Sequence, residues 1–463
     1  MNYNDTLEYL YSSAPVYQHI GASAYKPGLE TIITFDYYLC NPHCAFRSIH
    51  VAGTNGKGSV CHILAAVLKE AGFRVGLYTS PHLRDFRERI RVDGVMIDED
   101  FVVSFVRRNH SFFEPLRPSF FEITTAMAFD YFRSQKVDFA VIETGLGGRL
   151  DSTNIITPML SIITNIGLEH TKLLGHTLRE IAGEKAGIIK HMTPVVIGEA
   201  DSAEVESVFR RKAESMDAPI LFAQKEELIK DIHPGQDGSP TIYETEDFGS
   251  IACELSGDAQ QRNMTTVLCA LREIDRLLPG AITADAVNRG ASDVVALSGL
   301  RGRWERLSEA PLVIADTGHN LSAWTYLAPR IEAYASGHNR AVYMVIGFSS
   351  DKDVGAILDL MPRGAVYVLT QADSPRAMPL ATLLEKAKTA GLHGKAFLSV
   401  SESVGYVLSC MAEGDMLFIG GSNFIVADAL PLFEDNTQTE DGEQTEADTQ
   451  TKDNPQTESN KQP

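Results

Sequence analysis

The stretch HVAGTNGKGSV, residues 50–60, is close to a phosphate-binding loop but departs from the usual spelling. The common form has Gly, four residues, then Gly-Lys followed by Ser or Thr. Here Gly56-Lys57 follows Gly53 after only two residues, and Gly58 precedes Ser59. The spacing alone therefore does not identify the loop, and its sequence context has to be considered.

The flanking residues predict a strand before this loop and a helix after it. Residues 47–52 form a short β-prone run, and apolar residues recur at helical spacing over 61–71 before a second strand at 74–80. Free N–H groups and the dipole at a helix N-terminus attract phosphate. We therefore expect Lys57 to meet the outer phosphates and the Ser59 hydroxyl to ligate magnesium. The alternative is a glycine-rich turn that binds no ligand.

Composition limits the class of protein. The 463-residue chain has a formal net charge of −20, which argues against a dedicated nucleic-acid binder because such proteins need a basic face. It has no apolar run of the length that spans a membrane, and its N-terminus lacks the pattern of a signal peptide. We expect a cytoplasmic protein that has no membrane partner.

Short β-prone runs alternate with helical stretches from about residue 47 to 200, which predicts a mostly parallel sheet covered on both faces. A second alternating series begins near residue 300, after the glycine-containing break ALSGLRGR. The predicted fold class is α/β, with an N-terminal P-loop-type parallel-sheet ATPase domain at 1–298 and a smaller C-terminal Rossmann-like α/β domain at 299–433. The cleft between them is the expected active site.

Residues 434–463 differ in composition from the rest of the chain. They contain nine acidic and two basic residues and no aromatic residue. Such a segment cannot bury enough apolar surface to fold, so we expect a disordered acidic tail.

Several polar side chains follow predicted strands and would therefore meet at one edge of a sheet. Glu143 ends an apolar run before a glycine-rich turn, and a carboxylate there suits the magnesium of a bound nucleotide. His170 ends the next strand and is either a ligand to a second metal or a solvent-facing histidine. Lys185 follows on the next helix, where a salt bridge is the ordinary expectation. Arg303 either reaches across the cleft to phosphate or forms an interdomain salt bridge.

Cys40, His43 and Cys44 form a C-x-x-H-C cluster, but no second ligand pair stands at zinc-finger spacing. Ordinary cysteines beside a proline turn are the favoured interpretation. Six cysteines in so long a chain do not make a disulfide framework.

Together these motifs resemble one family. In chain order they are GTNGKGS, SPHL with ERIRVDG, FFEITTAMAF, ETGLGGRLDSTN, ITNIGLEHTKLLGHTLREIAGEKAGIIK, RGRWE, DTGHN, the Asp351-Lys352-Asp353 triplet and GGSNF. The chain from about residue 5 to 432 is similar to folylpolyglutamate synthase and dihydrofolate synthase, members of the Mur ligase superfamily. The contracted loop spelling is that family's own.

The resemblance implies an ATP-dependent ligase that adds L-glutamate to dihydropteroate, to reduced folates or to both, through an acyl phosphate. We favour both activities, with a single activity as the alternative and another Mur-type amino-acid ligase as a more distant one. A P-loop NTPase acting as a binding or switch module is a rival of a different class. The resemblance further implies two Mg²⁺ ions, leaves room for K⁺, and suggests a monomer.

The resemblance also implies residue roles. The catalytic residues are expected to be Lys57, Lys185, His170, His319 and Arg303. The expected ATP contacts are Gly53, Thr54, Asn55, Gly56, Lys57, Gly58, Ser59, Val60, Asn263, Arg303 and Asp316. The expected metal ligands are Ser59, Glu143, His170 and Lys185, the last as a carbamate, which reverses the salt-bridge interpretation. The expected folate or pteroate contacts are Ser80, Pro81, His82, Phe121, Thr125, Arg149 and Asp151. Arg376 and His319 are expected near glutamate.

Two positions depart from the family pattern. Ala259-Gln260 stands where many members have His-Gln, and Gly318 replaces the commoner alanine of the Asp-x-Ala-His-Asn motif. Neither change removes a proposed reacting group, so they bear on the adenine pocket rather than on the reaction.

Overall fold

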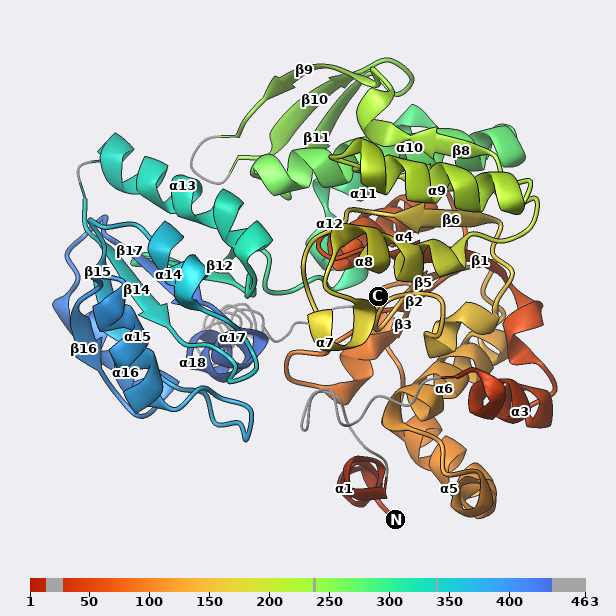
Figure 1. Cartoon of the computed structure of the whole chain (residues 1–463), viewed down its shortest axis with the longest axis horizontal. Helices are drawn as coiled ribbons and strands as arrows, with labels where there is room; N and C mark the ends of the chain where they lie inside the picture. Colours follow the sequence, from red (N-terminus) through yellow and green to blue (C-terminus); the bar gives the residue numbers. More distant parts are fainter. Residues whose placement is uncertain (14–27, 236–238, 339, 435–463) are drawn as a thin grey trace, which may run out of the picture.

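The computed structural model describes residues 1–13, 28–235, 239–338 and 340–434. The acidic tail from residue 435 onward lies outside the described residues, so its predicted disorder stays a prediction. Two α/β units stand side by side (Figure 1). We call the described residues up to Ser298 the N-terminal unit and those from Gly299 the C-terminal unit. No helix in the described ranges is both long and apolar enough to cross a membrane.

The N-terminal unit is built on an eight-stranded sheet with the order β4-β3-β2-β5-β1-β6-β7-β8. Strands β1, β2, β5, β6, β7 and β8 pair in parallel, and β3 and β4 form an antiparallel edge. The strands are β1 (Arg47–Ala52), β2 (Val75–Tyr78), β3 (Ile90–Val92), β4 (Val95–Met96), β5 (Phe139–Glu143), β6 (Leu160–Ile163), β7 (Val195–Ile197) and β8 (Ile220–Phe222).

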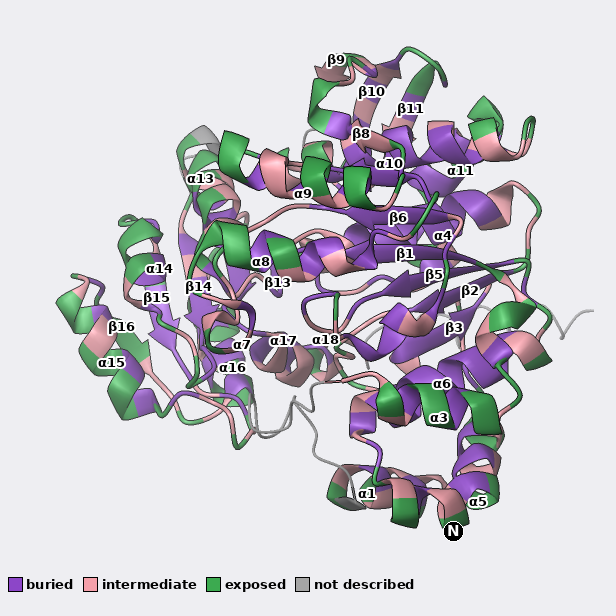
Figure 2. Ribbon diagram, turned by 45° about the vertical axis from the view of Figure 1, so that its right-hand side comes forward, coloured by how far each residue is buried: buried purple, intermediate pink, exposed green. Residues whose placement is uncertain are grey.

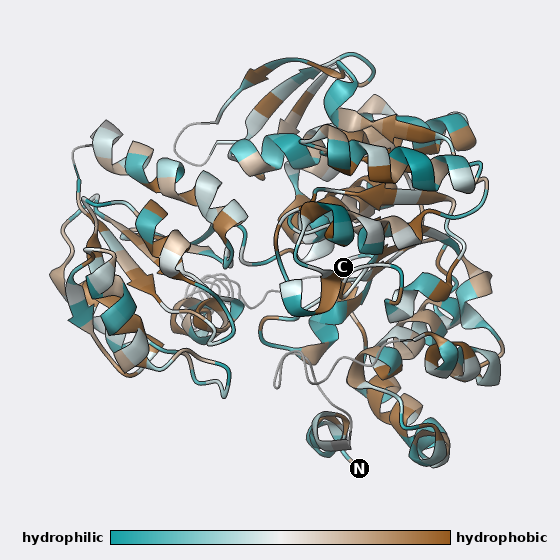
Figure 3. Ribbon diagram, viewed as in Figure 1, coloured by the Kyte–Doolittle hydropathy of each residue, from teal (hydrophilic) through white to brown (hydrophobic). Residues whose placement is uncertain are grey.

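Helices cover both faces of this sheet because its central strands are apolar on both sides (Figure 3). One face packs on α4 (Lys57–Glu70), α10 (Asp258–Leu277), α11 (Ala284–Ser292) and α12 (Val294–Ser298). The core on the other face includes side chains of α1 (Tyr3–Ser13), α3 (Glu30–Tyr38), α5 (Glu99–Leu116), α6 (Phe120–Ser134), α8 (Leu178–Lys185) and α9 (Ala203–Ser215). Short helical turns connect the remaining segments: α7 (Thr171–Leu174), η2 (Pro42–Ala45), η3 (Phe86–Arg89), η4 (Ser152–Ile155), η5 (Ala186–Ile188) and η6 (Ala223–Lys225).

A separate three-stranded antiparallel sheet interrupts the alternation of strands and helices. Its strands are β9 (Ile229–His233), β10 (Thr241–Thr245) and β11 (Ser250–Cys253), in the order β11-β10-β9. Buried Tyr243 and Ile251 join the same core as α4 and α10. The sequence analysis did not predict this sheet, because β9 is short and largely exposed and so carries little periodic signal.

The C-terminal unit contains a six-stranded sheet with the order β12-β13-β17-β14-β15-β16, parallel except for β12. Its strands are β12 (Glu305–Glu309), β13 (Leu312–Asp316), β14 (Val342–Ile346), β15 (Val366–Leu369), β16 (Gly394–Ala396) and β17 (Met416–Gly420). Its helices are α13 (Leu321–His338), α14 (Gly355–Leu360), α15 (Leu380–Thr389), α16 (Val400–Cys410), α17 (Asn423–Ala429) and α18 (Pro431–Glu434). The central strands are buried between two helical layers (Figure 2).

The predicted α/β class and the parallel sheets are confirmed. Helix α8 ends at Lys185 and continues only as the turn η5. The β3–β4 hairpin was not predicted. The carboxyl ends of β1, β5 and β13 carry the loop at residues 53–56, Glu143 and Asp316 toward the space between the units, where ligands of open α/β sheets bind.

Candidate active site between the two units

The two units enclose a cavity of about 390 Å³ that residues from both of them line. The N-terminal unit contributes the loop segment 54–59 and the carboxyl end of β5. The C-terminal unit contributes the turn at 316–319. The cavity is therefore lined by the strand ends that the sequence analysis singled out.

The loop between β1 and α4 has the geometry that the sequence context predicts. Gly56 adopts a left-handed φ of 80° at the N-cap of α4, and a Cβ there would collide with the Asn263 side chain. Asn55 is held from two sides: its N–H donates to Asn165 Oδ1 at 2.8 Å, and its side chain pairs with Asn320 of the C-terminal unit. The loop is thus a fixed turn at a helix N-terminus, which suits an anion.

Two lysines meet at the first glycine of the loop. Lys57 donates to the carbonyl oxygens of Gly53 and Thr54 at 3.0 and 3.1 Å, and Lys185 donates to the same Gly53 oxygen at 2.7 Å. Lys185 is only 4% exposed. Burial, reinforced by the charge of Lys57, lowers the pKa of the Lys185 amine to about 7. Near neutral pH a large share of this amine is therefore uncharged and nucleophilic.

Ser59 and Glu143 supply oxygen donors beside the loop. Ser59 is buried on the first turn of α4, and its Oγ accepts a hydrogen bond from Gln260 Nε2 at 3.3 Å. Glu143 Oε2 accepts the Ser80 N–H at 3.1 Å and lies about 4.0 Å from where a Cβ on Gly58 would stand. Burial raises the pKa of the Glu143 carboxyl, and the charges of Lys57, Arg303 and Arg89 oppose that rise.

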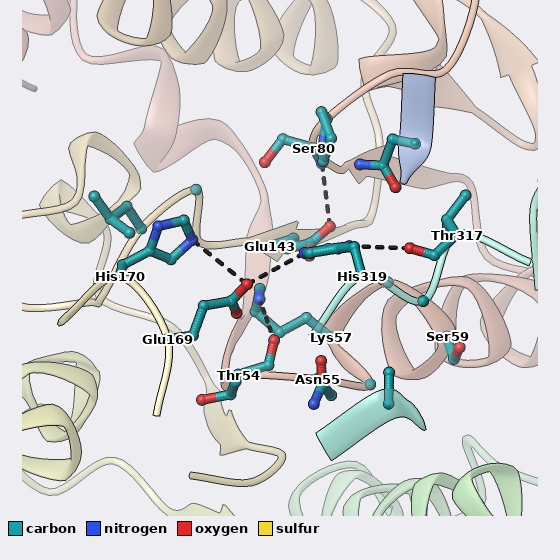
Figure 4. A pocket seen from close by; sticks show the side chains of 18 of the residues that line it. Thr54, Asn55, Lys57, Ser59, Ser80, Glu143, Glu169, His170, Thr317 and His319 are labelled. Atoms are coloured by element: carbon teal, nitrogen blue, oxygen red, sulfur yellow. Dashed lines mark hydrogen bonds and ion pairs between the residues drawn. The ribbon is translucent and has the colours of Figure 1, made fainter. Parts of the chain in front are cut away.

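Glu169 joins the two units across the cavity (Figure 4). Its Oε1 lies 3.2 Å from Nε2 of His319 and 2.9 Å from Nζ of Lys352, both in the C-terminal unit. His170 Nε2 is 3.9 Å away. Although burial acts in the opposite direction, the hydrogen bond from His319 and the charge of Lys352 hold the pKa of Glu169 well below its usual range. Glu169 is therefore an anion that links its own unit to His319 and Lys352 of the other unit.

The rings of His319 and His170 are in different environments. Nδ1 of His319 faces the carbonyl oxygen of Thr317 at 2.9 Å while Nε2 faces Glu169. Burial, together with the charges of Lys352 and Lys57, lowers the pKa of His170 to about 4. Its imidazole is therefore neutral at pH 7.

We predict that Glu169→Gln destabilises the protein at neutral pH but not in acid. A lowered folded-state pKa means that the carboxylate stabilises the fold above its unfolded pKa of about 4.3, and that this contribution disappears as the pH falls. Loss of the charge-assisted bonds is expected to cost about 2 kcal/mol, or about 4 °C in melting temperature at pH 7. Melting curves recorded at pH 7 and at successively lower pH, through and below the lowered folded-state pKa, test this, with exposed Glu204→Gln as control. A deficit that stays constant down to the lowest pH at which the wild type is folded would contradict it.

The other predicted ATP residues also gather around the loop. Asn263 is buried against Gly56, and its Nδ2 donates to Gln260 Oε1 at 2.8 Å. The Arg303 guanidinium donates to the Thr317 hydroxyl, with one nitrogen about 3.9 Å from a Cβ on Gly58. Asp316 accepts the N–H groups of Trp304 and Gly318 at 2.8 and 2.7 Å, and burial raises the pKa of its carboxyl. Among the predicted contacts, Gly53 and Val60 support the loop without lining the cavity.

The residues predicted to contact the pterin-bearing substrate divide into two groups. Ser80, Pro81, Phe121 and Asp151 line the cavity. His82, Thr125 and Arg149 do not.

Each residue of the second group is engaged elsewhere. Thr125 is fully buried, with its hydroxyl 3.2 Å from that of Tyr78. His82 Nδ1 accepts from Arg89 Nε at 2.7 Å, and Arg149 pairs with Glu184 at 2.9 Å. Of these partners, Arg89 lines the cavity, whereas Tyr78 and Glu184 do not.

Arg376, predicted near glutamate, lines the cavity and pairs with Asp351 at 2.8 Å. Glu169, Lys352 and Arg89 are among the cavity residues that the predicted site did not include. Glu169 and Lys352 stood in quoted motifs, but nothing in the sequence shows that they meet. Arg89 is 4% exposed and lies over the Phe120 ring at 5.3 Å, and burial lowers the pKa of its guanidinium. Arg89 immediately precedes the short strand Ile90–Val92 in the motif ERIRVDG. That position beside a strand was the signal that could have revealed Arg89 as a cavity residue.

The donor set suits a magnesium ion bound jointly with phosphates. Within the described ranges, no three His, Cys, Asp or Glu side chains converge as a preformed metal cage. Mg²⁺ is usually held by one or two carboxylates together with substrate phosphates. Ser59 and Glu143 provide such oxygens at the glycine-rich loop, with neutral His170 nearby. These residues fit the ion.

The chain is similar to known ligases over most of its length. Residues 51–271 match the family model of the Mur ligase middle domain, and residues 302–423 match that of the Mur ligase glutamate ligase domain. Folylpolyglutamate synthase of Lacticaseibacillus casei is 34% identical over 390 residues, covering 82% of this chain and 88% of the relative. Dihydrofolate synthase/folylpolyglutamate synthase of Bacillus subtilis (strain 168) is 32% identical, covering 87% and 94%. The solved Mycobacterium tuberculosis folylpolyglutamate synthase complexed with ADP has a TM-score of 0.82 and 28% identity, covering 93% and 98%.

Proposed function

The chain belongs to the folylpolyglutamate synthase and dihydrofolate synthase family of Mur ligases, and from this premise we propose that it ligates L-glutamate to dihydropteroate and to reduced folates at the expense of ATP. The observation that best supports this proposal is the cavity between the units, which is lined by the phosphate loop and by the turn at 316–319. A ligase needs the phosphate donor, the acceptor carboxylate and the amine in one enclosed space.

A carboxylate is a poor electrophile, and its oxygen is a poor leaving group. In the proposed reaction the acceptor carboxylate attacks the terminal phosphorus of ATP, and ADP leaves. The amine of glutamate then attacks the carbonyl carbon of the acyl phosphate, and the tetrahedral intermediate collapses to the amide with loss of phosphate. The backbone N–H groups of the loop and the side chains of Lys57 and Arg303 stabilise the transferring charge.

Lys57 and Lys185 have distinct proposed roles, although both now donate to Gly53. When ATP binds, the Lys57 amine would leave the carbonyl oxygens of the loop and contact the outer phosphates of ATP. Lys185 is to react with carbon dioxide and hold a metal as a carbamate, which its burial and its lowered pKa of about 7 support. Ser59 and Glu143 would hold one Mg²⁺, and His170 and carbamylated Lys185 a second. Bound Mg²⁺ offsets the repulsion between the anionic substrates. We also propose that the protein binds K⁺.

The remaining cavity residues are assigned to the acceptor and to glutamate. Ser80, Pro81, Phe121 and Asp151 form the wall proposed for the pterin-bearing acceptor, and buried Arg89 adds a cation to it. Arg376 and His319, on the C-terminal unit, are proposed to receive glutamate. We further propose domains at 1–298 and 299–433, a monomeric cytoplasmic protein, and no nucleic-acid partner, the last in keeping with the charge of −20.

The test is ADP release with ATP, magnesium and L-glutamate, comparing 7,8-dihydropteroate with tetrahydrofolate as acceptor. Release with both acceptors, dependent on glutamate, is the expected result. Release with one acceptor would assign a single activity. ADP release that needs no glutamate would favour the NTPase alternative. If neither acceptor stimulates release from folded protein, the folate assignment is wrong, and cell-wall precursors become the next acceptors to test.

A further inference from the structure

A second reactive cluster lies outside the ligase cavity, where the chain leaves α3 and enters β1. It consists of Asp36, His43 and Cys44, and none of the three lines the cavity. Helix α3 lies on the side of the N-terminal unit away from the C-terminal unit (Figure 1). The proposed ligase reaction leaves these residues without a role.

The three side chains form a continuous chain of contacts. Asp36 Oδ2 lies 2.6 Å from His43 Nδ1, and His43 Nε2 lies 3.2 Å from Cys44 Sγ. The Asp36 side chain is 4% exposed, that of His43 is 21% exposed, and Cys44 is exposed. Because the buried Asp36 carboxylate accepts a hydrogen bond from Nδ1–H of His43, the proton of a neutral ring is on Nδ1. The lone pair of Nε2 then faces the Cys44 sulfur.

The local backbone explains why residues seven positions apart meet. Helix α3 ends at Tyr38, and Cys40 and Asn41 then adopt left-handed φ values of 63° and 52°. This reversal lets the Asn41 N–H donate to the Asp36 carbonyl oxygen at 2.8 Å. It also returns His43, in η2, over the last turn of α3. Non-glycine residues adopt such φ values at a cost in energy, so the turn is specifically held.

The cluster opens onto a hollow in the surface. Asp36 and His43 line it together with Tyr37, Asn41, Ile33 and Ile155. The second carboxylate oxygen, Asp36 Oδ1, is buried and has no hydrogen-bond partner among the described residues. An unsatisfied buried oxygen is costly unless a further donor reaches it. The hollow therefore offers space beside Asp36 and His43, the two residues that line up behind the Cys44 sulfur.

We propose that Cys44 is a covalent modification site, an activated thiol that exchanges with low-molecular-weight disulfides. His43 Nε2 takes the thiol proton, and Asp36 stabilises the resulting imidazolium, the arrangement that activates cysteine nucleophiles generally. The Cys44 sulfur then attacks one sulfur of the reagent. A new S–S bond forms, the old one breaks, and the departing thiolate takes the proton from His43. The product is a mixed disulfide and one free thiol, with no other oxidant required.

Zinc binding is the competing interpretation of the C-x-x-H-C pattern. The described residues contain no group of three His, Cys, Asp or Glu side chains arranged to hold a metal ion. Both ring nitrogens of His43 are also engaged, one with a carboxylate and the other with a thiol. These contacts favour proton transfer over coordination.

The test compares two exposed cysteines that lie four residues apart. Cys40→Ser/Cys410→Ser retains Cys44, and Cys44→Ser/Cys410→Ser retains Cys40; the other three cysteines are buried. The folded variants are mixed at pH 7 with the disulfide 5,5′-dithiobis(2-nitrobenzoate), and release of the coloured thiolate gives the rate. Glutathione disulfide is then used, and mass spectrometry of the peptide locates the adduct.

We expect Cys44 to react about tenfold faster than Cys40. An unassisted cysteine is only about 3% thiolate at pH 7, so a neighbouring base that takes the thiol proton raises the rate, and His43 Nε2 lies in contact with the Cys44 sulfur. Adding His43→Gln to the Cys44 variant should bring its rate to that of Cys40, and the difference should shrink at pH 9. Equal rates for the two cysteines, or a rate unaffected by His43→Gln, would overturn the proposal. Because His43 is partly exposed, that variant is expected to fold, and melting curves check it.

Discussion

Replacing Lys185 with alanine is expected to lower the rate of ligation by on the order of 10³-fold, the scale seen when a group stabilising transition-state charge is removed. Lys185 is buried, meets Gly53 of the phosphate loop at 2.7 Å, and has a pKa lowered to about 7. If it acts as a carbamate, the variant loses both a metal ligand and a negative charge. Glutamate-dependent ADP release is the measurement.

Chemical rescue separates a carbamate from a simple structural amine. Acetate or another small carboxylate can enter the space left by the side chain and should restore part of the activity. Exposed Lys172→Ala, on neighbouring α7, is the matched control and should retain full activity. Full activity in Lys185→Ala itself would eliminate the carbamate role.

The wild-type pH dependence provides an independent check on the same residue. Only the neutral amine reacts with carbon dioxide, and the lowered pKa means that Lys185 becomes protonated as the pH falls through about 7. Activity should therefore fall between pH 8 and pH 6, and added bicarbonate should offset part of the loss. An unassisted lysine, with a pKa near 10.4, would be almost wholly protonated across that range.

Glu143→Gln is expected to raise the Mg²⁺ concentration needed for half-maximal ADP release by on the order of 100-fold. Changes even to outer-shell partners cost about 10- to 100-fold in metal affinity, and Glu143 is proposed to touch the ion itself. The substitution preserves shape and removes a charge whose burial is unfavourable, as the raised pKa of this carboxyl indicates. The melting temperature should therefore be unchanged or slightly higher.

Magnesium titrations of the wild type and Glu143→Gln check this prediction. The exposed carboxylate of Glu227 lies outside the cavity, and Glu227→Gln should titrate like the wild type. Unchanged magnesium dependence in Glu143→Gln would remove this residue from the metal site. A large loss of stability would instead mean that its bond to the Ser80 N–H is mainly structural.

Local pattern was enough to predict the strand, glycine-rich loop and helix of β1 and α4, and the strand ends around them. Apolar strands and the helical period of α4 specify a strand-loop-helix unit without reference to distant residues. Because parallel strands end at one sheet edge, Glu143 could be placed beside Ser59 from sequence. The division into two α/β series was equally visible, since alternation of strand and helix is repeated in both.

Contacts between distant segments were not predictable in this way. Glu169 and Lys352 are 183 positions apart, and their bond depends on how the two units pack. Thr125 stood in a family motif, yet packing turned its hydroxyl toward Tyr78 and away from the cavity. Asp36, His43 and Cys44 meet through two left-handed residues that are not glycine. Periodicity records which side chains are buried, whereas the neighbours that each one meets depend on the paths of chain turns and the docking of whole units.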